Sequence, residues 1–71
     1  MTDKTTYRVL REGDLWRIEL AGDSVSEYED TKGSAIERAR ALARRAAHGE
    51  VVVLDAEGEV EQHFDVEHGR G

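Results

Sequence analysis

The sequence predicts an α+β domain of element order β-β-β-α-β-β, a single mostly antiparallel sheet with one helix packed on one face. Residues 30–49 place apolar side chains at helical spacing. Three short segments before this stretch and two after it show the alternation or the apolar run of β-strands. The 71 residues are expected to form one domain, with an ordered core at residues 5–66 and a flexible tail at 67–71.

The first three strands are expected before the helix. Residues 5–10 and 15–20 alternate in hydrophobicity and flank a tight turn near Gly13, which is typical of a hairpin. A third strand at residues 25–29 is short and polar, and we interpret it as an edge strand.

The apolar pattern of the hairpin predicts its register. Pairing Leu10 with Leu15 keeps the apolar residues of the two strands on matching sides. This register also places Arg8 opposite Arg17, and like charges in that position destabilise a sheet. The two arginines therefore need acidic neighbours, with Glu19 and Glu61 as candidates, or an external anion.

The helix is expected to begin after Thr31, whose hydroxyl can accept a hydrogen bond from an amide of the first turn. Gly49 is expected to end it. One stripe is apolar and rich in alanine, so the helix can lie close to the sheet. The stripe consists of Ala35, Ile36, Ala39, Leu42, Ala43 and Ala46.

The last two strands are expected at residues 50–55 and 60–66. The first is a continuous apolar run, typical of a strand buried on both faces. The connecting residues 55–58 suit a β-turn that ends with Gly58 in the left-handed region. This loop predicts that Leu54 pairs with Val60.

These registers assign every strand residue to one side of the sheet. The helix side is predicted to hold Tyr7, Val9, Trp16, Ile18, Leu20, Tyr28, Val52, Leu54, Val60 and Phe64. The other side is predicted to hold Arg8, Leu10, Leu15, Arg17, Val51, Val53, Glu61 and His63. The second set is too apolar for a solvated face.

The charge distribution limits the classes of partner. The net charge is −6, yet the predicted helix is basic and carries Arg38, Arg40, Arg44 and Arg45. An acidic overall field opposes nucleic acid and anionic membranes. No stretch is apolar and long enough to span a bilayer, so we expect a cytoplasmic protein. Arginine outnumbers lysine in this acidic chain, a composition similar to that of proteins from salt-loving organisms.

Residue patterns that carry chemistry are absent from the sequence. It has no cysteine, no Walker loop, no dinucleotide fingerprint and no nucleophile elbow, so we expect neither an enzyme nor a cofactor. His63, Asp65 and Glu67 alternate onto one side of the last strand. Successive members lie about 6.5–7 Å apart, too far for all three to bind one ion, so we predict a solvated edge rather than a metal site.

Three parts of the chain together resemble a known family. They are Trp16 in the second strand, the segment YEDTKGSAIERARALA, and the segment GEVVVLDAEGEV. In these parts, roughly residues 7–66, the chain is similar to the small prokaryotic proteins known as domain of unknown function 2188. The resemblance implies the fold. It implies no activity and no catalytic residue.

The leading hypothesis for function is a non-catalytic structural or protein-interaction module that forms a homodimer or binds another protein. Its contact surface would be the side of the sheet away from the helix, with Leu10, Leu15, Val51, Val53, Arg8 and Arg17. The alternative is a nucleic-acid-binding module. It would use either Arg38, Arg40, Arg44 and Arg45 or the Arg8 and Arg17 side of the sheet.

Overall fold

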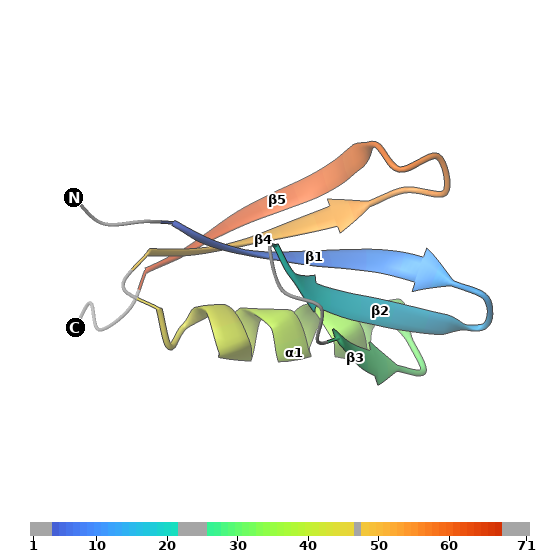
Figure 1. The fold of residues 1–71 in the computed structure, drawn as a ribbon, viewed down its shortest axis with the longest axis horizontal. Helices are drawn as coiled ribbons and strands as arrows, with labels where there is room; N and C mark the ends of the chain where they lie inside the picture. The colour runs from blue at the N-terminus through green and yellow to red at the C-terminus, as the bar shows by residue number, and fades with distance from the viewer. Residues whose placement is uncertain (1–3, 22–25, 47, 68–71) are drawn as a thin grey trace.

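A computed structural model describes residues 4–21, 26–46 and 48–67 (Figure 1). These residues form one helix and a five-stranded sheet in the predicted order β-β-β-α-β-β. The elements are β1 (Thr5–Glu12), β2 (Leu15–Leu20), β3 (Ser26–Glu29), α1 (Lys32–Ala43), β4 (His48–Leu54) and β5 (Val60–Glu67). The predicted α+β class is therefore confirmed.

The strands lie in the order β3-β2-β1-β4-β5, and the sheet is mixed because it contains both parallel and antiparallel pairs. The central pair, β1 and β4, is parallel, and the other three pairings are antiparallel. A parallel pair needs a long crossover, and here β2, β3 and α1 lie between its two strands in sequence. Helix α1 lies across one side of the sheet, which we call the covered face (Figure 1).

The β1–β2 hairpin has the predicted faces but not the predicted register. Glu12 pairs with Leu15 across the turn, and Arg8 pairs with Glu19 instead of Arg17. Gly13 has a φ of 64°, which allows a two-residue loop and lengthens both strands at the turn. The shift is two residues, and a shift of two leaves each side chain on its own side of the sheet.

Helix α1 begins as predicted and ends earlier than predicted. The Thr31 hydroxyl accepts a hydrogen bond of 3.1 Å from the amide of Ser34. The helix ends at Ala43, and Gly49 lies inside β4 rather than at the helix end. A Cβ added to Gly49 would lie 2.3 Å from the carbonyl oxygen of Ala43. Glycine is therefore required there by the close approach of β4 to the helix end.

The β4–β5 hairpin contains a bulge that reverses part of the predicted pattern. Leu54 pairs with Val60 as predicted, and Gly58 has a φ of 83° as its turn requires. The register then shifts by one residue between Val53 and Leu54. Val51 and Val53 pair with Tyr7 and Val9 of β1, face the helix, and are both fully buried. The prediction that these two valines lie on the other side of the sheet is wrong.

The core lies between the covered face and the alanine stripe of α1. Its buried members are Val9, Ile18, Ala35, Ala39, Ala43, Val51, Val53 and Val66. Tyr7, Trp16, Ile36, Leu42 and Phe64 pack against it and are partly buried. These residues confirm most of the predicted contributions of β1, β2 and α1, together with that of Phe64. Leu20 and Ala46 were also predicted, but they are not part of the core, and Ala46 lies beyond the end of α1.

Four other strand residues also differ from the prediction. Val52 alternates with the buried Val51 and Val53, so it faces away from the helix instead of toward it. Tyr28 pairs with Arg17 and so lies on the side away from the helix, where it is 45% exposed. Val60 is 63% exposed and belongs to no core. The Glu61 carboxylate accepts a hydrogen bond from Lys32 of α1, so this side chain reaches the helix side. Residues 22–25, which include the first residue of the predicted third strand, and tail residues 68–71 lie outside the described residues.

Candidate functional site on the open face

The described elements leave the side of the sheet opposite α1 uncovered, and we call this side the open face (Figure 1). Backbone pairing places alternate residues of all five strands on it. They are Thr6, Arg8, Leu10, Glu12, Leu15, Arg17, Glu19, Ser26, Tyr28, His48, Glu50, Val52, His63 and Asp65. Two polar clusters and a group of apolar side chains share this face.

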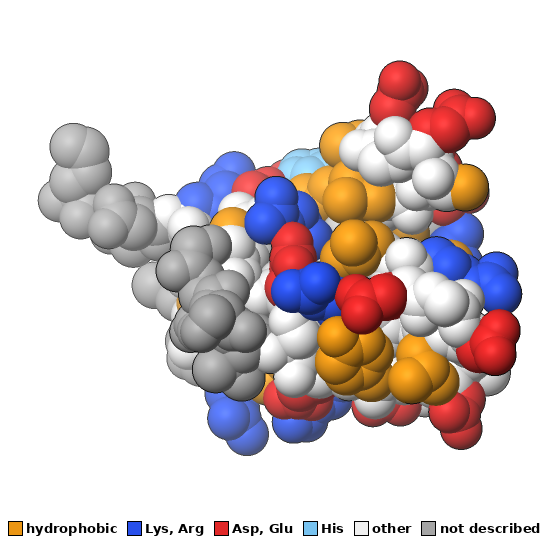
Figure 2. Space-filling model, turned by 45° about the vertical axis from the view of Figure 1, so that its right-hand side comes forward, with side chains coloured by type: hydrophobic (Ala, Val, Ile, Leu, Met, Phe, Trp, Pro, Cys, Tyr) orange, Lys and Arg blue, Asp and Glu red, His pale blue; other side chains and the backbone are white. Residues whose placement is uncertain are grey.

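The first cluster is a chain of ion pairs along β1 and β2. The Glu19 carboxylate contacts Arg8 Nη2 at 2.6 Å through one oxygen and Arg17 Nη2 at 3.2 Å through the other. Arg17 Nη1 also lies 3.1 Å from Glu12, which accepts a hydrogen bond from the Tyr28 hydroxyl at 3.3 Å. Figure 2 shows this alternation of blue and red side chains between hydrophobic ones. Glu19 thus provides the acidic neighbour that the sequence required.

The charges of this cluster are balanced within the chain. Two arginines face two glutamates, so the formal charge of the group is zero. The hydrogen bond from Arg17 to Glu12, with the nearby negative charge of Glu19, raises the pKa of the Arg17 guanidinium. These charges therefore need no external anion.

Apolar side chains flank the ion pairs. Leu10 and Val52 are half-buried on adjacent central strands, while Leu15 is 39% exposed and Tyr28 45% exposed. Of the predicted contact residues, Arg8, Leu10, Leu15 and Arg17 lie on this face. Val51 and Val53, which were predicted on this face, are in the core, and the apolar residues found here instead are Val52 and Tyr28. The sequence run of three valines contains no alternation, so it could not show which of them face outward.

The second cluster lies where β1 begins and joins three strands. Glu50 accepts a hydrogen bond of 2.5 Å from Thr6 Oγ1 and lies 2.6 Å from His63 Nε2. Lys4 Nζ lies 3.7 Å from the same carboxylate, and Asp65 lies 3.8 Å from His63 Nε2. The Thr6 hydrogen bond, followed by the contact with His63, lowers the pKa of Glu50.

The second cluster contains two of the three residues, His63, Asp65 and Glu67, that the sequence analysis considered as metal ligands. His63 and Asp65 are in it, but the third residue is Glu50 on the neighbouring strand. The Glu67 side chain lies outside the described part of the chain. Glu50 was missed because its position beside His63 depends on the β4–β5 register. One signal in the sequence was available. Glu50 lies two residues before Val52, so in a strand both side chains are on the same side, opposite that of Val51.

The arginine face predicted from the sequence consists of Arg38 and Arg40 on α1 and of Arg44 and Arg45 just after its end. Arg38 and Arg40 make contacts within the chain. Arg38 donates two hydrogen bonds, of 2.8 and 3.2 Å, to the carboxylate of Glu27. This contact lowers the pKa of Glu27 and raises that of Arg38. The Arg40 guanidinium stacks over Phe64 at 5.2 Å from the ring centroid. The Glu27 carboxylate offsets the positive charge of Arg38, whereas stacking on Phe64 holds the Arg40 guanidinium in place without removing its charge.

Comparison with known proteins gives one family. A family model described as "Uncharacterized protein conserved in bacteria (DUF2188)" matches residues 7–64. No match was found among curated proteins or among solved structures. In the three described segments, no helix has the length and apolar character needed to cross a membrane.

Proposed function

Because the chain belongs to the uncharacterised bacterial family DUF2188, whose description assigns no activity, we propose a function from geometry. The protein is a small, non-catalytic interaction module that forms a homodimer through its open face. The observation that carries this proposal is the combination, on one uncovered side of the sheet, of apolar side chains with a self-neutralised ion-pair cluster. The proposal includes a cytoplasmic location, which fractionation of the source cells would test.

The charge pattern favours a second copy of this chain as the occupant. The whole chain carries −6, so two copies repel each other over most of their surfaces. At the centre of the open face, Arg8 and Arg17 are matched by Glu12 and Glu19. Two such regions can approach each other without net repulsion, and a two-fold axis lets each present the same surface.

The size of the face is also suitable. The molecule extends 36 × 22 × 22 Å. A face that measures 36 by 22 Å can bury at most about 800 Å² against a partner. This is about the area that each partner buries in a stable complex. Leu10, Leu15, Val52 and Tyr28 would supply the apolar centre, and the ion pairs would form the polar part. Transfer of apolar area from water contributes about 25 cal/mol per Å² before the costs of association.

Sedimentation equilibrium of the wild type and two variants tests this proposal. At about 50 µM, a concentration at which a functional dimer should be formed, the wild type is expected to be dimeric. Leu10→Asp places a charge in the apolar centre and is expected to give a monomer with an unchanged circular dichroism spectrum. Arg44→Glu, on the helix side, reverses an exposed charge far from the open face and should leave the dimer intact.

Two results would contradict the proposal. One is a monomeric wild type at that concentration. The other is a Leu10→Asp variant that remains dimeric, which would place the interface elsewhere. Nucleic-acid binding is the lesser alternative, because Arg38 and Arg40 of the arginine face are engaged within the chain. Fluorescence anisotropy with duplex DNA and with RNA separates the two functions.

A further inference from the structure

We infer that Glu50, His63 and Asp65 form a binding site for a divalent cation of the zinc class on the open face. The three residues come from the neighbouring strands β4 and β5, and the pairing brings them together. Glu50 pairs directly with Asp65, and His63 pairs with Val52, so all three side chains project to the same side. The inference does not rest on the proposed dimer, because all three ligands belong to one chain.

The ligand atoms are already close to the spacing that a metal needs. One imidazole nitrogen and one oxygen from each carboxylate lie within 4.8 Å of one another. His63 Nε2 lies 2.6 Å from Glu50 Oε1 and 3.8 Å from Asp65 Oδ1. Tetrahedral bonds of about 2.1 Å place ligand atoms roughly 3.4 Å apart. The required adjustments are therefore small and fall on exposed side chains.

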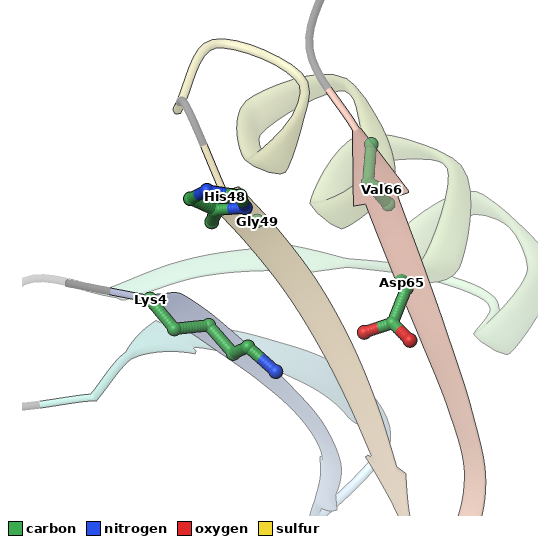
Figure 3. Close-up of a pocket in the computed structure, with 5 residues that line it drawn as sticks. All are labelled: Lys4, His48, Gly49, Asp65 and Val66. Atoms are coloured by element: carbon green, nitrogen blue, oxygen red, sulfur yellow. The ribbon is translucent and has the colours of Figure 1, made fainter. Parts of the chain in front are cut away.

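The electrostatics of the cluster favour an added cation. Two carboxylates directly opposite each other on paired strands repel. Lys4 and His63 are the basic groups that face them. Figure 3 shows Lys4 and Asp65 reaching toward each other from either side of β4. The Lys4 side chain is 54% exposed and can move away, whereas a divalent ion would bind both carboxylates directly.

The Glu50 carboxylate is fixed in position before any ion arrives. Its side chain is only 16% exposed, and Thr6 Oγ1 donates to Oε2, which leaves Oε1 directed toward His63. Hydrogen bonds of this kind orient metal ligands and raise affinity.

The ligand types select the class of metal. Imidazole suits zinc and its neighbours in the first transition series, whereas magnesium and calcium prefer oxygen ligands alone. Three protein ligands leave at least one position for water or a small anion. A pocket of about 210 Å³ adjoins Asp65 and is lined also by Lys4, His48, Gly49 and Val66 (Figure 3). It gives that additional ligand room.

Calorimetric titration of the untagged protein with ZnCl₂ tests the site. The wild type is expected to bind one Zn²⁺ per chain, and His63→Gln and Asp65→Asn should each weaken the affinity by at least about tenfold. Glu61→Gln is the matched control, since it removes the same charge from the same strand outside the cluster, and it should leave the affinity unchanged. Lys4→Gln should strengthen binding, because it removes a competing positive charge. MgCl₂ should bind far more weakly.

Titration of the Leu10→Asp variant separates this site from the proposed dimer, because zinc binding should survive the loss of dimerisation. Absence of saturable binding at about 100 µM Zn²⁺, well above the affinities of built zinc sites, would overturn the inference. Equal affinity in wild type and His63→Gln would also overturn it, since zinc would then be held adventitiously by other surface carboxylates. Circular dichroism of each variant verifies that its fold is retained.

Discussion

The covered face and the open face of the same sheet are held by different interactions. On the covered face, Val9, Val51 and Val53 are completely buried against an alanine stripe. On the open face, the groups in contact are ion pairs between partly exposed side chains. Burial of an aliphatic side chain contributes about 1.5–3 kcal/mol, whereas an exposed ion pair contributes about 0–1 kcal/mol. Stability therefore resides mainly on the covered face, and the open face is free to serve binding.

The largest expected effect compares two adjacent valines of β4. Val53→Asp buries an unpaired charge on the covered face and should remove about 4 kcal/mol or more. That is comparable to the roughly 4–10 kcal/mol expected for a domain of this length. Val52→Asp lies on the open face, beside Arg8 in the register, and should cost about 1 kcal/mol. Urea denaturation at low protein concentration measures both. Similar losses in the two variants would mean that the faces do not differ as described.

A medium effect is expected at the contact between β4 and the end of α1. Gly49→Ala forces a Cβ against the carbonyl of Ala43 and should destabilise the fold by about 1–3 kcal/mol. Gly33→Ala is the matched control, because its added Cβ meets nothing within 4 Å. A helical alanine in place of glycine should stabilise by about 0.5–1 kcal/mol. Thermal unfolding of both variants should shift in opposite directions, and an unchanged Gly49→Ala would contradict the close approach.

The smallest expected effect is on the pKa of one carboxylate from each face, Glu27 on the helix side and Glu50 on the open face. The pKa values of Glu27 and Glu50 should both lie below the ordinary 4.5, chiefly because Arg38 and Thr6 donate hydrogen bonds to them. Arg38→Ala should raise the pKa of Glu27 alone, and Thr6→Val that of Glu50 alone. NMR titration of the side-chain carboxyl carbons, with a chelator present, measures each. If both values move together in either variant, the two faces are coupled.

The sign of the pH effect on stability follows from the direction of these shifts. A carboxyl group whose folded pKa is depressed binds fewer protons in the folded state than in the unfolded state. Its contribution to stability is fully present above pH 4.5 and is lost as pH falls through the lower folded value. Acid should therefore weaken the wild type more steeply than it weakens Arg38→Ala.

Much of the site was predictable from the sequence, and the errors have specific causes. Arg8, Leu10, Leu15 and Arg17 were placed on the correct side because alternation in β1 and β2 is clear and the register error was two residues. The sides of Val51 and Val53 were predicted wrongly because the Leu54–Val60 register, continued without the bulge in β5, pairs Val51 with His63 instead of Phe64. A run of valines satisfies either arrangement equally well.

The sequence by itself determined the element order, the N-cap at Thr31, the alanine stripe and the left-handed glycine of the last hairpin. These features depend on local periodicity and on backbone conformations available to few residues. Only the tertiary structure decided the parallel β1–β4 pairing, the side on which each valine of β4 lies, and the meeting of Glu50 with His63 and Asp65. Pairing between strands that are distant in sequence depends on how the whole core packs, so a local sequence pattern does not predict it.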